Sequence, residues 1–371
     1  MLLWGVVVLV WTPRSARLGP VLFFAALLRV ILLFSPPTLS DDLYRYLWEG
    51  RVWLAGFNPF ALAPDAAELA GVRDADWALV NHRGVPSVYP PLAQLLFVGL
   101  SGGGALLWKL AMGLCDLGSV YVLFARDVRA GWLWALLPLP VVETAGSGHL
   151  EGIGVLLLLV ALSQPARVAL WAAWAGAMIK LLPGVILLPL WLTARRPPAA
   201  GLGLVVASLL VSLPILGAGP AMFEGFGTYA SSWSFNGSLY PLLSGFLGAG
   251  LARTLLIAVG LLITVGVWVR VRDPGRVAVW GLGAFVCLSP TVHPWYVLWV
   301  LAAGLYLGLR SWALLAALMP LAYLVLGTLD PATGRWEESG WVRWAIYLPF
   351  YAASGLEGWR RWSRPGPWPV H

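Results

Sequence analysis

A pair of adjacent acids stands at the start of the first long polar segment of the chain, where Asp41 and Asp42 follow Ser40. Serine followed by acids is a preferred helix start, because the hydroxyl accepts from free backbone N–H groups and the carboxylates complement the helix dipole. Two neighbouring carboxylates can also share proton transfer, one acting as general base while the other raises its pKa or orients a substrate. The pair therefore predicts either a catalytic base or a capped helix in a solvated loop.

The residues after the pair predict the helix that would position it. The polar side chains that share a face with Asp42 at helical spacing are Arg45, Tyr46 and Glu49. Trp48 and Val52 fall mostly on another face, which is typical of an amphipathic helix lying at a membrane interface. Gly56 ends the helix, and Asn58-Pro59 prevents it from continuing.

Other ionisable side chains stand near apolar stretches, where such groups are costly and mark functional sites. They are Tyr89 before two prolines, His149 and Glu151 within GSGHLEG, Lys180, and His293 and Tyr296 within SPTVHPWY. Structural roles are the alternative: a pair at helix ends for His149 and Glu151, snorkelling for Lys180 and a turn for His293. Asp116 and Glu143 favour structural pairing, and Arg29 could pair with either.

The composition identifies lipid as the main solvent of this chain. Sixty per cent of the 371 residues are hydrophobic and 11% are charged, whereas soluble domains carry about a quarter charged residues. The net charge of +7 comes almost wholly from arginine, since Lys109 and Lys180 are the only lysines. The basic residues do not cluster on one face, as nucleic-acid binding would require. The two cysteines lie in apolar runs and favour buried free thiols over redox chemistry or a zinc site.

The arginines predict which loops face the cytoplasm. They mark the segments at Arg14/Arg17, Arg126/Arg129, Arg195/Arg196, Arg270/Arg272/Arg276, Arg310 and Arg360/Arg361/Arg364. The segments 36–89, 219–250, 290–294 and 330–340 then face outside. We expect a multi-pass protein of the cell membrane with its active site on the extracytoplasmic side.

Two apolar runs are too irregular for single spans. Run 90–125 is broken by Ser101 and three glycines, and run 168–194 is broken by Lys180 and Pro183-Gly184. Broken helices are tolerated only where they are buried in protein or line a cavity. We predict an all-α polytopic membrane protein with about 11–13 transmembrane or re-entrant helices. One domain would cover 1–358, with 36–89 as first outer loop containing interfacial helices and 359–371 as a cytoplasmic tail.

The outer-facing polar groups suit sugar transfer from a lipid. Soluble nucleotide donors do not reach that side, so a polyprenyl-phosphate sugar is the expected donor. One of Asp41 and Asp42 would take the proton of the attacking hydroxyl. The departing phosphate would be stabilised by cations, with Arg45 and Arg51 on the acidic helix as ligands and Lys180 or His293 as point donors. A single displacement inverts the sugar carbon.

Five motifs carry a resemblance to a known family. They are SDDLYRYLWEGRVWLAGFNP, VYPPLAQLLF, AGSGHLEGIGVLLLL, KLLPGVILLPLW and SPTVHPWYVLWV, spread from about residue 19 to residue 355. The chain resembles bacterial polyprenol-phosphate-sugar-dependent glycosyltransferases of the GT-C fold, and within them the mannosyltransferase-like members. The first and last motifs are the specific ones.

The resemblance implies a GT-C fold, mannose as the sugar and an acid of the first outer loop as general base. Related members with an Asp-Glu pair use the first acid, which favours Asp41, but the second position is also aspartate here and both stay candidates. We predict Arg45, Arg51, Tyr89, His149, Glu151, Lys180, His293 and Tyr296 as donor phosphate or sugar ligands; His149, Glu151, Lys180, His293 and Tyr296 also match the family's motifs, which assign them no role. No metal or other cofactor is expected, and the acceptor is a glycolipid, glycan or protein. The alternative is a transporter or lipid flippase with a midplane polar site.

Overall fold

The structure, a computed structural model, describes residues 1–194, 197–330 and 336–362, with only the backbone of residues 361 and 362. Several predictions fall on the remaining residues. Arg195, Arg196 and Arg364, the side chain of Arg361, residues 331–335 of the predicted outer loop and residues 363–371 of the predicted tail lie outside the described part.

Every regular element of the described residues is a helix, and the only β-type pairings there are isolated bridges from Phe235 and Asn236 to Thr291. Four helical segments are long and apolar enough to cross a membrane: α5 (Gly104–Arg126), α11 (Pro197–Leu216), α14 (Ala249–Arg270) and Ser311–Thr328, which comprises α17 (Ser311–Leu318) and η7 (Met319–Thr328). Seven shorter apolar segments accompany them, at the lower end of the predicted 11–13. The all-α polytopic prediction is confirmed.

The shorter apolar segments are α2 (Leu18–Leu33), α4 (Pro91–Ser101), α8 (Glu151–Ser163), α9 (Ala166–Ile179), η4 with α10 (Leu182–Ile186 and Leu187–Leu192), α15 (Pro274–Leu288) and η6 with α16 (Pro294–Tyr296 and Val297–Tyr306). The other elements are α1 (Leu2–Val10), α3 (Asp42–Leu54), η1 (Ala67–Val72), η2 (Ala75–Leu79), α6 (Val128–Leu136), α7 (Pro138–Val141), η3 (Val142–Gly146), η5 (Gly219–Phe223), α12 (Glu224–Ser232), α13 (Tyr240–Leu247) and α18 (Gly340–Trp362).

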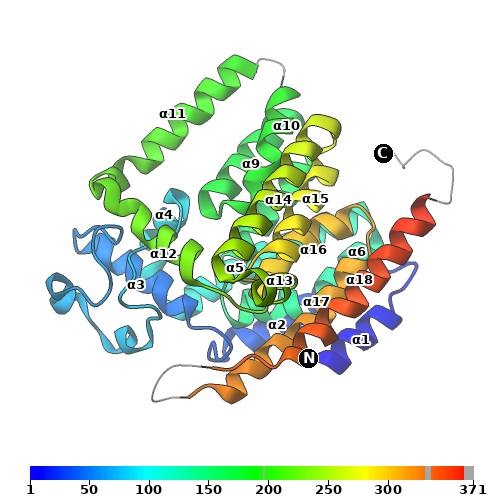
Figure 1. Ribbon diagram of the computed structural model, residues 1–371, viewed down its shortest axis with the longest axis horizontal. Coiled ribbons are helices and arrows are strands. Elements are labelled where there is room, and N and C mark those ends of the chain that lie inside the picture. Colours follow the sequence, from blue (N-terminus) through cyan, green and yellow to red (C-terminus); the bar gives the residue numbers. More distant parts are fainter. Residues whose placement is uncertain (195–196, 331–335, 363–371) are drawn as a thin grey trace.

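The core is built around α16, whose residues from Val297 to Leu305 are all buried. It packs against α8, α15 and α17 in the middle of the molecule (Figure 1). A Cβ on Gly154 of α8 would come within 2.2 Å of the Trp299 ring, so only glycine permits this close approach. The helix α11 differs: it stands apart from the body in Figure 1, and 6% of its most apolar window is buried. Its apolar exposed side is suited to contact with lipid.

Both predicted breaks occur where the sequence places them. Helix α4 ends at Ser101 and α5 begins at Gly104, which has a φ of 61°. Helix α9 ends at Ile179 with Lys180 as its C-cap, and η4 and α10 then fold back against α9. The broken run 168–194 therefore folds as a hairpin with Lys180 at its turn.

Helix α3 begins at Asp42 and ends before Gly56, whose φ is 84°, as the sequence predicts. Its surroundings differ from the expected interfacial helix. Trp48 and Val52 are fully buried, because the loop after α3 folds over them with Leu69 and Val80. The helix is therefore held inside the protein on most of its circumference, which fixes the direction of its first residue.

The segments predicted to face outside gather at one end of the molecule. The ring of His82 lies 4.0 Å from that of Trp233, and the backbone N–H of Asn236 donates to Glu338 at 2.8 Å. Two segments marked by arginines also lie near each other: the Arg126 side chain donates to the carbonyl of Tyr306, which ends the helix before Arg310, at 3.4 Å. The predicted outer loops thus share one region, and its membrane side stays a prediction.

Candidate active site

Asp42 is the point at which distant polar side chains meet. Its Oδ2 lies 3.4 Å from the Tyr46 hydroxyl, which donates to it, and 3.7 Å from Nδ1 of His149. Its Oδ1 accepts from the Asn81 side chain at 2.7 Å. The Asp42 side chain keeps 19% of its surface exposed, so a substrate can reach a carboxylate that protein holds on its other sides.

Asn81 joins the two predicted acids. Its amide nitrogen donates to Oδ1 of Asp41 at 2.8 Å as well as to Asp42. Burial and the negative charge of Asp42 raise the pKa of Asp41. Burial also acts to raise the pKa of Asp42, but the imidazole rings of His149 and His293, the ammonium of Lys180 and the hydrogen bond from Asn81 together outweigh it and lower that pKa below its ordinary value. Asp42 is therefore the more readily ionised member of the pair.

A second carboxylate lies behind His149. The Nε2 atom of His149 is 3.3 Å from Oε2 of Glu143, and Oε1 of Glu143 accepts from the Tyr323 hydroxyl at 2.6 Å. Both His149 and Glu143 are fully buried, and neither ring nitrogen has a hydrogen bond. The short π-helical turn η3 brings Glu143 under the following GSGHLEG segment, where Gly148 adopts a φ of 73°. The chain thus places an imidazole between two carboxylates.

Lys180 and Glu151 form the cationic side of the site. Nζ of Lys180 lies 2.5 Å from Oε1 of Glu151, and the same oxygen accepts from Nε1 of Trp299 at 3.1 Å. Nζ also lies 4.7 Å from the centre of the Tyr296 ring, a cation–π distance. Because 18% of the Lys180 side chain is exposed, its ammonium can reach an anionic ligand. Glu151 is therefore the partner that places Lys180.

A stack of four rings runs from His149 to Phe235. Trp295 lies between the two histidines, with ring-centre distances of 3.9 Å to His149 and 4.5 Å to His293, and Phe235 stacks on His293 at 5.2 Å. A backbone hydrogen bond holds the segments of Phe235 and His293 side by side, since Val292 N–H donates to the Phe235 carbonyl at 2.8 Å. Burial lowers the pKa of His293 to about 3. His293 is therefore a neutral ring at neutral pH, leaving Lys180 as the fixed cation near Asp42.

Two further tyrosines border the site. Tyr89, predicted from the sequence, packs edge-on against Tyr46 at 5.2 Å, and burial raises its pKa well above the ordinary value. Tyr229 was not predicted, and its hydroxyl lies 2.7 Å from that of Tyr296. Neutral phenols at these places can donate hydrogen bonds to a sugar or a phosphate.

The two arginines predicted to bind phosphate lie elsewhere on α3. The Arg45 guanidinium donates to Glu49 at 2.6 Å and to the carbonyls of Asn81, His82 and Val85. Arg51 pairs with Asp74 at 3.1 Å on a more exposed part of the loop. The contacts of Arg45 occupy its donors, so the geometry favours a structural role. Through Asn81 and His82 it holds the loop that reaches the two acids.

Other predicted pairs resolve simply. Arg29 binds Asp116 at 2.5 Å, and Asp116 also accepts from Trp134, so the structural pair is confirmed with Asp116 rather than Glu143. Lys109 donates to the carbonyls of Leu32 and Ser35 at the end of α2. Within the described ranges no group of three or more His, Cys, Asp or Glu could hold a metal ion.

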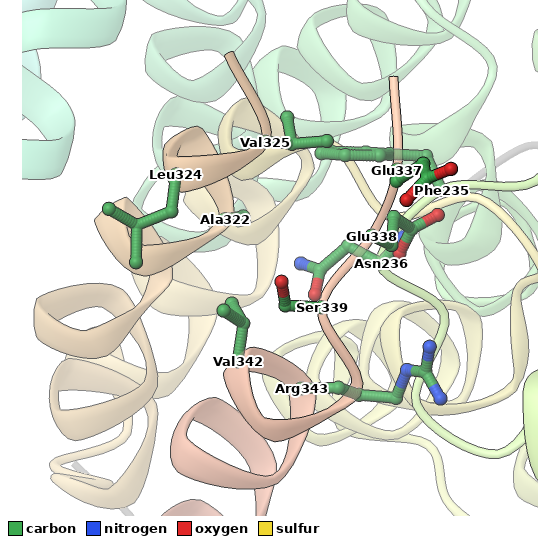
Figure 2. A pocket seen from close by; sticks show the side chains of 10 residues that line it. All are labelled: Phe235, Asn236, Ala322, Leu324, Val325, Glu337, Glu338, Ser339, Val342 and Arg343. Atoms are coloured by element: carbon green, nitrogen blue, oxygen red, sulfur yellow. The ribbon is translucent and has the colours of Figure 1, made fainter. Parts of the chain in front are cut away.

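A solvent-open pocket of about 340 Å³ adjoins the outer end of the ring stack (Figure 2). Phe235 and Asn236 line one side of it. Glu337 and Glu338, from the segment before α18, and Arg343 of α18 also line it. No predicted site residue lines this pocket. The pocket meets the site only through Phe235, which also stacks on His293.

Of the residues predicted from the sequence, the structure brings together Asp41, Asp42, His149, Glu151, Lys180, His293 and Tyr296, and their roles stay predictions. It adds four neighbours that the sequence did not indicate: Asn81, Tyr229, Trp295 and Tyr323. Tyr229 and Trp295 lie in or next to segments predicted to face outside, and that shared location was the available signal. Nothing local distinguishes Asn81 or Tyr323, because only the chain fold brings them to Asp42 and Glu143.

The chain is similar in sequence to two bacterial enzymes. It is 29% identical over 352 residues to alpha-(1->6)-mannopyranosyltransferase B of Corynebacterium glutamicum, covering 76% of this chain and 57% of that protein. It is 25% identical over 363 residues to a probable alpha-(1->6)-mannopyranosyltransferase of Mycolicibacterium smegmatis, covering 76% and 63%. The chain thus spans less than two thirds of either relative. No known family profile matches it. The resemblance to mannosyltransferase-like enzymes is confirmed by these relatives.

Proposed function

We propose that this protein is a membrane glycosyltransferase that moves mannose from a polyprenyl-phosphate donor to an acceptor hydroxyl at the outer face of the membrane. Asp42 is the general base, and the sugar carbon is inverted. The names of the two relatives support mannose as the sugar. The all-helical membrane architecture supports a donor whose chain lies in the bilayer.

The convergence of ionisable groups on Asp42 carries this proposal. Asp42 is the acid of the pair that lies within ion-pair distance of His149, and its pKa is lowered by the surrounding imidazole rings, by the ammonium of Lys180 and by the hydrogen bond from Asn81. It is ionised at neutral pH, as a general base must be before it accepts a proton. Asp41 is more exposed and lies toward Asn81.

Lys180 is the group best placed to receive the leaving phosphate. The acceptor oxygen forms a bond to the anomeric carbon while the bond from that carbon to the phosphate oxygen breaks, and its electron pair leaves with the phosphate. A fixed ammonium stabilises this charge in a water-poor site. Glu151 holds Lys180 at 2.5 Å, the Tyr296 ring lies 4.7 Å from its ammonium, and the Tyr296 hydroxyl contacts that of Tyr229 at 2.7 Å.

The test is a transfer assay with purified protein in lipid nanodiscs, using radiolabelled polyprenyl-phosphate mannose and a panel of glycolipid, glycan and peptide acceptors. The expected product carries mannose with the opposite anomeric configuration to the donor. Lys180→Ala is expected to weaken donor binding, whereas Lys109→Ala, which removes an ammonium that donates to the carbonyls of Leu32 and Ser35, is the matched control. Unchanged donor affinity in Lys180→Ala contradicts its assigned role.

The same preparation separates the enzyme from the transporter alternative. In sealed vesicles a transporter moves the lipid across the bilayer and leaves the sugar–phosphate bond intact. Absence of mannosyl product with every acceptor, together with lipid movement by the wild-type protein, would overturn the proposed function.

A further inference from the structure

We infer that His149 receives the proton that Asp42 takes from the acceptor, and that Glu143 is the positioning residue that orients His149 for this step. The inference rests on the proposed function, and deepens it by giving the proton a place to go. Three observations carry it: the position of His149 between two carboxylates, its lack of hydrogen bonds, and its rigid stacking.

The positions of the three side chains form a line. Nδ1 of His149 lies 3.7 Å from Oδ2 of Asp42, and Nε2 lies 3.3 Å from Oε2 of Glu143. Catalytic hydrogen bonds are often long without substrate and shorten in the substrate complex. If Nε2 carries the hydrogen toward Glu143, Nδ1 presents its lone pair to Asp42. Asp42 can then pass a proton to Nδ1.

The polar atoms of this line are buried without hydrogen-bond partners. Both ring nitrogens of His149 and Oε2 of Glu143 have none, although both residues are fully buried. Buried polar atoms without a partner in the folded chain are normally completed by water, a ligand or a reacting group, so these atoms are available to exchange a proton. By contrast, Oε1 of Glu143 is anchored by Tyr323 at 2.6 Å.

The imidazole is also held in one plane. Its ring lies 3.9 Å from that of Trp295 at an angle of 21°, and this stack sets the plane in which its two nitrogens face the two acids. Of the three side chains within hydrogen-bond or ion-pair distance of Asp42 in the described structure, Asn81 and Tyr46 are donors. His149 is the one that can accept a proton.

The charges facing His149 favour its protonated form after transfer. Asp41 and Asp42 lie on one side and Glu143 on the other, while the neutral ring of His293 is reached across Trp295. Lys180 acts on Asp42 and lies with its counter-ion Glu151. An imidazolium between two carboxylates is stabilised by both.

The proton balance is complete without another reactant. The acceptor O–H bond breaks and an O–H bond forms on Asp42, while the leaving phosphate takes the electron pair of the broken sugar bond. The proton then moves from Asp42 to Nδ1 of His149, which restores the ionised base. After the products leave, the proton returns through Asp42, which is partly exposed, to water.

The first test uses His149→Ala with and without added imidazole. Removing the proton acceptor is expected to lower kcat by about 10²-fold with little change in KM for the donor, since general acid–base groups contribute about 10²–10⁴-fold. Imidazole can occupy the space left beside Trp295 and is expected to restore at least a tenth of the lost rate. Asp42→Asn with imidazole is the control and stays inactive. Wild-type kcat in His149→Ala, or loss without rescue in a folded variant, contradicts the inference.

The second test does not depend on activity. The ring titration of His149 is followed by NMR in protein labelled at histidine, and assigned by comparison with His149→Gln. Asp42→Asn and Glu143→Gln are each expected to move the titration midpoint to lower pH, because each removes a neighbouring negative charge. Glu68→Gln, an exposed acid of η1, is the matched control.

The two tests separate the inference from the proposed function. If wild-type protein transfers no sugar, the proposed function fails while the titration still measures whether the three groups are coupled. If it transfers sugar but neither variant shifts the midpoint more than Glu68→Gln does, the relay is overturned and Asp42 alone remains as the base.

Discussion

The start and the middle of α3 each carry a charged cluster, and the polar groups of the two clusters are hydrogen-bonded to different degrees. Near its middle, Arg45 pairs with Glu49, and Oε2 of Glu49 accepts from Ser87 at 2.6 Å and Gln94 at 2.7 Å. At its first residue, Asp42 faces His149, whose nitrogens have no hydrogen bonds. Both clusters are largely buried and about two turns apart.

The difference separates a structural cluster from a reactive one. Buried polar groups are normally paired because an unpaired group keeps its desolvation cost. The Arg45–Glu49 cluster follows this rule and fastens the loop to α3. The Asp42 cluster leaves groups open on a site that retains exposure, so a ligand or a proton can complete it.

The largest expected effect is the loss of turnover when Asp42 is replaced. Asp42→Asn keeps the helix start, since asparagine is also a good N-terminal residue, but it cannot accept a proton. We expect kcat to fall by about 10²–10⁴-fold with unchanged thermal unfolding. Single-turnover transfer from labelled donor measures it. Full activity in Asp42→Asn together with its loss in Asp41→Asn would reverse the roles of the two acids.

In the Arg45–Glu49 cluster, Glu49→Gln should lower the stability of the fold and leave the chemistry intact. Leaving Arg45 buried without its carboxylate costs about 3–5 kcal/mol of unfolding free energy. Denaturant unfolding in detergent measures this, with Glu68→Gln as the exposed control. Activity per folded molecule should stay within a few-fold. A stable Glu49→Gln protein with lost turnover would place Glu49 in the chemistry and remove the contrast.

Asn81 links the two clusters, because its carbonyl accepts from Arg45 and its side chain donates to Asp42. Asn81→Ala should therefore have an intermediate effect on turnover. It removes a hydrogen bond to a carboxylate, worth about 1.5–3 kcal/mol, and turnover is expected to fall about tenfold. The hydrogen bond from Asn81 lowers the pKa of Asp42, so without it that pKa rises. The acid limb of the rate profile then moves to higher pH. An acid limb at the wild-type position argues against Asp42 as the titrating base.

The smallest effect is expected for Asp41→Asn, an exposed substitution whose cost is within about 0.5 kcal/mol, or about twofold in rate. A base must be ionised, so activity is lost as pH falls through its pKa. The pKa of Asp42 lies below the ordinary 3.8 and that of Asp41 above it. We expect wild type and Asp41→Asn to share an acid limb below that value. A limb above 3.8 that disappears in Asp41→Asn assigns the base to Asp41.

Local features were predictable because local rules govern them. The start of α3 at Asp42, its end before Gly56 and the chain reversal at Lys180 follow from capping, glycine and proline. The prediction that Arg45 binds phosphate rested on its sharing a helix with the acids. Spacing along a helix says which residues share a face, but not that the loop carbonyls of Asn81, His82 and Val85 would meet that arginine.

Composition alone identifies lipid as the solvent and limits the chemistry available. With 60% hydrophobic and 11% charged residues, the chain must fold in lipid, and its few ionisable groups in apolar segments must be paired or functional. Which of the two holds for each group depends on the fold. Asp42, Glu143 and His149 come together through contacts between α3, η3 and the segment before α8. Hydrogen-bond satisfaction depends on distances across the fold, which the order of residues along the chain does not contain.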